Sequence, residues 1–137
     1  MAKQLSDSSL DRKNVLNNNY ALETIKEYLG IKGTFYEGEL KFTLKEVADF
    51  YGVTRETVSR YLTSYADELR QNGYEVYTGQ KLQSFMETDS DMDVTIKARR
   101  VGVFNFKAFI NLGLLLQESE RARILRRAIL DLDVRHG

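Results

Sequence analysis

Hydroxyl and guanidinium side chains recur between residues 54 and 64, where the spacing of the apolar residues predicts a helix. Val58, Tyr61 and Leu62 recur at helical intervals and would form its buried side. The opposite side would carry short polar and charged groups, which are the types that bind phosphate oxygens and base edges. The chemistry predicted is therefore non-covalent recognition of double-stranded DNA. The candidate DNA contacts are Thr54, Arg55, Glu56, Thr57, Ser59, Arg60, Thr63 and Ser64.

A second helix is predicted directly before this one, because Thr43 and Glu46 have the spacing of a capping box. Its end is indicated by Gly52, a residue that enters the left-handed region of backbone space at little cost. Two helices joined by a short turn that contains glycine are typical of a helix-turn-helix. We therefore expect the helix over residues 54–72 to enter the major groove. Thr43 and Lys45, at the start of the first helix, are further candidate DNA contacts.

Two stretches rich in β-branched and aromatic residues, 74–78 and 101–106, follow the predicted recognition helix. Such composition is typical of strands. Two strands in this position predict a winged helix-turn-helix over residues 19–106, with a long wing loop over residues 79–100. A basic wing can lie along the phosphate backbone or reach into the minor groove. The candidate wing contacts are Lys81, Lys97, Arg99 and Arg100.

The flanking regions complete a fold that we predict to be mainly α with a small β-wing, in the α+β class. Residues 1–18 are polar and are expected to be a flexible N-terminal arm. Residues 107–137 predict a helical hairpin, whose first helix is apolar on more than one side. Such a surface must be covered, so we expect the hairpin to be an oligomerisation element, most simply in a homodimer.

The overall composition excludes several functional classes. The 137 residues contain no cysteine, and 20 basic residues balance 20 acidic ones. This balance counts against a strongly basic protein that coats DNA regardless of sequence, although a specific binder needs only a local basic patch. The sequence has no membrane-spanning apolar run and no signal-peptide pattern, so the expected location is the cytoplasm.

No enzyme motif or cofactor motif is recognisable in the chain. The only histidine is His136, close to the C-terminus. The alternating Asp89, Asp91 and Asp93 suggest a calcium loop, but an EF-hand needs glycine and glutamate where Val94 and Arg100 stand. We therefore expect no catalytic residues, no metal and no cofactor.

The motifs after the wing resemble DNA-binding proteins of bacterial mobile elements. They read Val-Phe-Asn-Phe-Lys-Ala from Val103, Ser-Glu-Arg-Ala-Arg-Ile-Leu-Arg from Ser119, and Ile-Leu-Asp from Ile129. The nearest types are the phage antirepressor-like and RhuM-like proteins and the regions found in front of Fic or toxin-type domains. The resemblance covers about residues 20–133 and implies sequence-specific DNA binding that regulates a mobile element, a phage or a toxin operon.

A second interpretation uses the same fold to hold a protein. The balanced charge favours this alternative, in which the winged unit is an antirepressor-like or partner-binding module for a regulatory protein. The polar groups between Arg55 and Ser64 favour DNA. The strong dependence of DNA binding on salt distinguishes the two.

Overall fold

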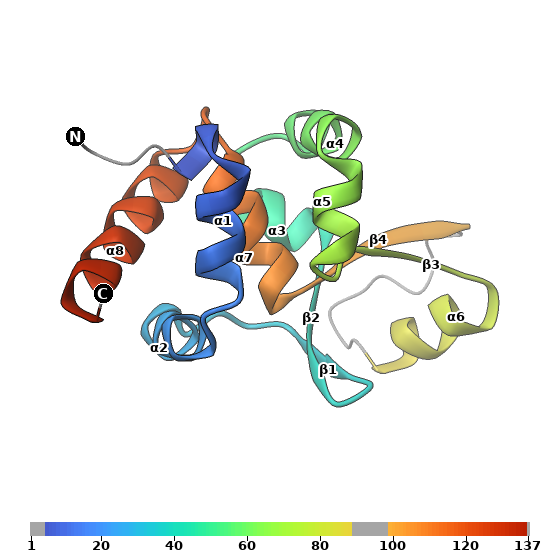
Figure 1. The fold of residues 1–137 in the computed structure, drawn as a ribbon. Helices are drawn as coiled ribbons and strands as arrows, with labels where there is room; N and C mark the ends of the chain where they lie inside the picture. The colour runs from blue at the N-terminus through green and yellow to red at the C-terminus, as the bar shows by residue number, and fades with distance from the viewer. Residues whose placement is uncertain (1–4, 89–98, 137) are drawn as a thin grey trace.

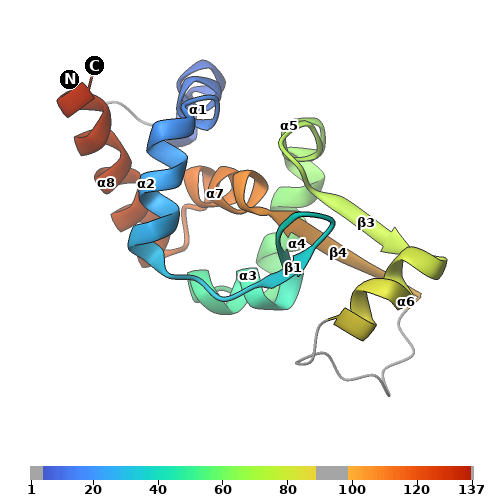
Figure 2. The same cartoon turned by 90° about the horizontal axis from the view of Figure 1, so that it is seen from below.

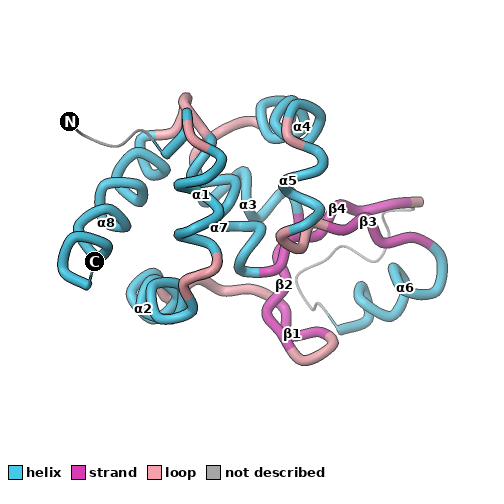
Figure 3. The backbone as a smooth tube through the Cα atoms, viewed as in Figure 1, coloured by secondary structure: helices cyan, strands magenta, loops and turns pink. Residues whose placement is uncertain are grey.

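The computed structural model describes residues 5–88 and 99–136, with side chains described as far as residue 132. Helices and a small sheet follow one another along the chain (Figures 1 and 3). The helices are η1 (Leu5–Asp7), α1 (Ser9–Leu16), α2 (Asn19–Leu29), α3 (Leu44–Tyr51), α4 (Arg55–Ser64), α5 (Ala66–Gln71), α6 (Gly79–Thr88), α7 (Phe106–Leu115) and α8 (Glu120–His136). The strands are β1 (Thr34–Tyr36), β2 (Glu39–Thr43), β3 (Glu75–Thr78) and β4 (Arg100–Asn105).

The helix-turn-helix is formed by α3 and α4, as predicted. The Thr43 hydroxyl accepts from the Glu46 amide at 3.2 Å, and the Glu46 carboxylate accepts from the Thr43 amide at 2.9 Å, so the capping box is complete. Gly52 ends α3 with φ +68°, in the left-handed region where only glycine is unstrained. The predicted single helix over residues 54–72 is interrupted at Tyr65, whose φ of −123° separates α4 from α5.

The sheet is antiparallel, with strand order β1-β2-β4-β3 among the described residues. The antiparallel pair of β3 and β4 joins Val76 to Gly102 and Thr78 to Arg100. It extends away from α7 and α8 in both Figure 1 and Figure 2, in the position of a wing, with α6 beside it. The α+β winged helix-turn-helix fold predicted from the sequence is therefore confirmed.

The N-terminal segment is not a flexible arm over its described length. Helices η1 and α1 occupy residues 5–16, and Leu5 and Leu16 are both buried in the main core. The buried guanidinium of Arg12 binds both oxygens of Glu68 on α5, at 2.7 and 2.8 Å. It also donates to the carbonyls of Leu5 and Ser6, both at 3.0 Å. These contacts hold the segment on the domain, although its polar composition predicts an arm.

Helix α7 lies at the centre of the molecule, in contact with η1, α1, α5, α8 and the strands β2 and β4. Every residue from Ala108 to Leu115 is buried. The chain brings Gly113 so close to Tyr51 that an added Cβ would lie 2.3 Å from the tyrosine oxygen. The α7–α8 hairpin is present, but the apolar surplus that suggested a subunit interface is covered within the same chain.

The segment predicted as a long wing loop begins with a helix, α6, which returns across the sheet. Leu82 and Phe85 of α6 form a second, smaller core with Tyr77 and Val103. Figure 2 shows α6 beside β3. The candidate calcium loop at Asp89, Asp91 and Asp93 lies outside the described residues. Within the described residues no helix is long and apolar enough to cross a bilayer, and no cluster of acidic or histidine side chains could hold a metal.

Candidate nucleic-acid interface

Most of the DNA contacts predicted from the sequence lie on the outward face of α4. Val58 and Tyr61 are buried and fix the rotation of the helix. Thr57 is half-buried, and the other candidates on this helix are exposed: Thr54, Arg55, Glu56, Ser59, Arg60, Thr63 and Ser64. The polar face of α4 is thus open to solvent, as insertion into a groove requires, although Arg60 also binds Glu118 of the α7–α8 turn.

Several hydroxyls on this face already form hydrogen bonds within α4 or at its N-terminal cap. The Thr54 hydroxyl accepts from the Thr57 amide at 3.1 Å and lies 3.0 Å from the Thr57 hydroxyl. The Thr63 hydroxyl donates to the Ser59 carbonyl at 3.1 Å. Ser59 and Ser64 make no such side-chain bond within the described chain, so their hydroxyls remain available to a ligand. Threonine hydroxyls keep acceptor capacity, so they can still receive a hydrogen bond from a base edge.

Arg60 is held by a network that the sequence did not reveal. It forms a short ion pair with Glu118, and its guanidinium lies over the Tyr61 ring, 5.5 Å from the centroid. The Tyr61 hydroxyl donates to the other Glu118 oxygen at 2.7 Å and accepts from the Gln117 amide at 3.0 Å. The Tyr61 hydrogen bond is the main cause that lowers the pKa of Glu118 below its ordinary value, with the charge of Arg60 acting in the same direction. The turn between α7 and α8 therefore fixes a carboxylate against the candidate recognition helix.

The two candidates at the start of α3 differ in their availability. Thr43 is buried and its hydroxyl caps the helix, so we leave it out of the interface proposed below. Lys45 is exposed and pairs with Asp49 at 3.3 Å, an arrangement that solvent weakens. Arg55 has no ion-pair partner among the described residues and is the least engaged cation of the helix-turn-helix.

The wing candidates are not brought together as one basic cluster. Lys81, on α6, binds Glu37 at 3.1 Å and Glu75 at 3.3 Å and lies 4.7 Å from the Tyr77 ring centroid. Its charge is thus largely compensated within the protein. Arg99 and Arg100 are exposed where β4 begins. Lys97 lies outside the described residues.

The arginines of the last helix also differ from one another. Arg126 turns inward and donates to the carbonyls of Gly113 and Leu116, at 2.9 and 2.7 Å, so it closes the end of α7. Arg121 donates to the Phe50 carbonyl at 3.0 Å. Arg123 and Arg127 are exposed. Helix periodicity in the sequence could not show that the end of α7 would attract Arg126.

One comparison with known proteins bears on this interface. Residues 40–73, which are 34 of the 137, match the family described as bacterial regulatory proteins, crp family. The match covers β2 from Leu40 onward, both helices of the helix-turn-helix and α5. It supports a helix-turn-helix regulator that binds DNA. No curated protein and no solved structure matches the chain.

Proposed function

We propose that this protein is a sequence-specific DNA-binding transcription regulator that reads the major groove with α4. The observation that carries the proposal is an exposed polar face on the second helix of a complete helix-turn-helix, in the region similar to the crp family. The cations and hydroxyls of this face match the donors and acceptors of base edges. We infer a regulator rather than an enzyme.

We assign phosphate contacts and base contacts to different parts of the proposed interface. Arg55 lies in the first turn of α4, where the helix N-terminus also favours phosphate, so it anchors the helix on the backbone. Arg60 and Ser59 lie one turn further along and read bases. Arg99 and Arg100 on the wing touch phosphates. The resemblance to antirepressor-like and RhuM-like proteins supports regulation of a mobile element, and a two-fold operator would be bound by a homodimer.

A binding-site selection on random duplex DNA, followed by a salt titration on the selected site, tests this function. We expect affinity to fall steeply with salt, with a slope of about 0.9 per phosphate neutralised. Ser59→Ala should weaken the selected site by roughly tenfold and leave random duplex unaffected. Ser84→Ala, at an exposed position on α6, is the matched control. Failure to enrich any site would favour the alternative, in which the winged unit holds a regulatory protein.

The wing is tested separately, because phosphate contacts weaken all sequences alike. Arg99→Ala with Arg100→Ala should reduce binding to selected and random duplexes by similar factors and lower the salt slope by one to two, roughly one per lost cation. A loss confined to the selected sequence would contradict a backbone role. Lys81→Ala should change the slope little, because Glu37 and Glu75 already compensate its charge.

A further inference from the structure

The two wing strands present one face to α6 and the opposite face to the side of the molecule on which α4 lies. Tyr77 packs against α6 in the smaller core. Because side chains alternate along a strand, Thr78 of β3 and its partner Arg100 of β4 lie on the other face, as does Gly102. In Figure 1, α4 lies above these strands and α6 below them. The face opposite α6 is therefore the one that a duplex bound to α4 would approach.

Tyr74, directly before β3, lays its ring across this face. The ring centroid lies 4.9 Å from that of Phe104, and a Cβ added at Gly102 would lie 2.4 Å from the Tyr74 hydroxyl oxygen. Glycine at position 102 thus leaves the space that the hydroxyl occupies. Phe104, Gly102 and Arg100 follow one another on this face of β4, so the hydroxyl end of the ring points along the strand toward Arg100.

A second arginine approaches the same hydroxyl from the helix side. Arg70 is exposed near the end of α5, four residues before Tyr74. Burial raises the pKa of Tyr74, and the positive charges of Arg100 and Arg70 act in the opposite direction, so both guanidinium groups lie close enough to the hydroxyl to stabilise a negative charge there. Two cations and one hydroxyl donor, from three segments of the chain, thus surround a single position.

The positive charge of this cluster is not compensated within the part of the chain that the structure describes. Neither Arg70 nor Arg100 forms an ion pair among the described residues. The two glutamates nearest in the sequence bind other cations, since Glu68 pairs with an arginine of α1 and Glu75 with a lysine of α6. Asp67 is exposed one turn before Arg70 and forms no ion pair with it. The cluster can therefore accept an anion.

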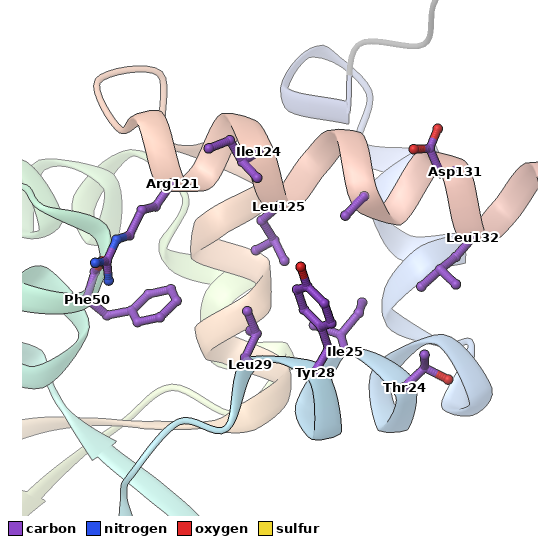
Figure 4. Close-up of a pocket in the computed structure, with 11 residues that line it drawn as sticks. Thr24, Ile25, Tyr28, Leu29, Phe50, Arg121, Ile124, Leu125, Asp131 and Leu132 are labelled. Carbon is purple, nitrogen blue, oxygen red and sulfur yellow. The ribbon is translucent and has the colours of Figure 1, made fainter.

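Two arginines at the start of α8 show the contrast. Arg121 donates to the Phe50 carbonyl at 3.0 Å, and Figure 4 shows its side chain reaching from α8 to Phe50. Arg123 pairs with Glu120 on its own helix. An anion that bound these two arginines would have to displace contacts that they already make.

We propose that Arg70, Tyr74 and Arg100 together bind one phosphate of the DNA backbone between α5 and the wing. The assignment rests on the proposed function and adds Arg70 and Tyr74 to its interface. A guanidinium matches phosphate oxygens through two parallel hydrogen bonds, and the tyrosine hydroxyl can donate another. A phosphate held by α5 and the wing together fixes the register in which α4 enters the groove.

Titrations of the selected duplex and of random duplex, repeated over a range of salt concentrations, test the assignment. Arg70→Ala should weaken both duplexes by similar factors, about three- to tenfold, and lower the salt slope by about one. Tyr74→Phe keeps the ring on Phe104 and should weaken both by about two- to tenfold without changing the slope. Arg127→Ala is the matched control, because it removes an exposed arginine of α8, at the opposite end of the molecule from the wing, and should change neither.

A series of selected duplexes, each with one phosphate replaced by an uncharged methylphosphonate, locates the contact. We expect one position at which the replacement weakens the wild type by roughly tenfold but weakens Arg70→Ala and Arg100→Ala far less, because each variant has already lost the contact. Thermal denaturation of the variants confirms that they keep the fold.

The outcome is separable from that of the DNA-binding proposal. A wild type that binds its selected site while Arg70→Ala keeps the full salt slope, or loses affinity for that sequence alone, overturns only the phosphate site. A methylphosphonate series without a shared position for Arg70 and Arg100 does the same. A wild type that binds no duplex overturns the proposed function and the phosphate site with it.

Discussion

Glu118 is the residue through which the α7–α8 turn touches the candidate recognition helix. A carboxylate beside a groove-reading helix repels phosphate, so its presence weakens binding to any duplex. The same carboxylate holds Arg60 against the Tyr61 ring and leaves the guanidinium in one orientation. Glu118 thus lowers the affinity for every duplex but fixes the position of Arg60, which we propose reads a base.

Glu118→Gln should strengthen binding to random duplex by about threefold, because one negative charge near the phosphates is removed. Binding to the selected site should gain less, since the neutral amide no longer fixes Arg60, so the ratio of specific to random affinity falls. Competition binding on the two duplexes measures this ratio. Glu120→Gln, which removes a neighbouring exposed carboxylate that pairs with Arg123, is the control.

Arg60→Ala should weaken the selected site by roughly 10- to 100-fold and relax the base preference at one position. The repeated selection with the variant shows which position is relaxed. If the variant instead weakened all duplexes equally, Arg60 would contact phosphate and not a base.

At the scale of elements, a polar network joins α1, α5 and α7. Arg12 binds Glu68 through two parallel hydrogen bonds, and Asn111 donates to the same carboxylate at 2.7 Å. Asn72 donates to the Asn111 side-chain oxygen at 2.9 Å. Burial raises the pKa of Glu68, but the hydrogen bonds from Arg12 and Asn111 and the charge of Arg12 outweigh it and leave the pKa below its ordinary value. The network therefore holds three helices together through an ionised carboxylate.

Arg12→Met should lower the free energy of unfolding by about 3–5 kcal/mol, because it leaves a partly buried carboxylate without its cation. Urea denaturation at pH 7 measures the loss. Lys13→Met, on the exposed side of the same helix, should change stability by no more than about 0.5 kcal/mol. Equal effects of the two substitutions would show that α1 is not held through Arg12.

The lowered pKa of Glu68 also predicts how stability depends on pH. A carboxyl whose pKa is lower in the folded state stabilises the fold above its ordinary value of 4.5 and loses that contribution as pH falls through the lowered value. Wild-type stability should therefore drop below about pH 4.5. Glu68→Gln should be less stable at pH 7 and show a shallower acid drop in a series of urea denaturations. An unchanged acid slope in Glu68→Gln would assign the drop to other carboxyls.

The elements that the sequence predicted well are those whose signals are local. The capping box at Thr43, the left-handed turn at Gly52 and the apolar period through Val58 each specify a few neighbouring residues, and all three are present. Arg12 and Glu118 could not be found in this way, because their partners are 56 and 58 residues distant along the chain. The polar composition of the N-terminal segment therefore predicts a flexible arm, although the buried guanidinium of Arg12 fixes the segment to the domain.

At the scale of the whole molecule, the N-terminal segment and the C-terminal hairpin build one core. Helix α7 is buried because η1 and α1 cover one side while α8 and the helix-turn-helix cover others. The same arrangement places the α7–α8 turn against α4 through Glu118 and Tyr61. Loss of η1 and α1 should therefore destabilise the core around α7. It should also loosen the contact of the α7–α8 turn with the candidate recognition helix α4.

Leu16→Ala should lower the free energy of unfolding by about 2–5 kcal/mol, because this side chain is 1% exposed and its removal leaves a cavity beside α7. Leu10→Ala, on the same helix but 65% exposed, is the matched control and should change stability by no more than about 0.5 kcal/mol. Thermal and urea denaturation measure both variants. Deletion of residues 1–17, which keeps the Asn18 cap of α2, should destabilise the chain more than Leu16→Ala and expose α7 to a hydrophobic dye. A deletion variant as stable as the wild type would mean that the segment is a dispensable arm and that another surface, such as a second copy, covers α7.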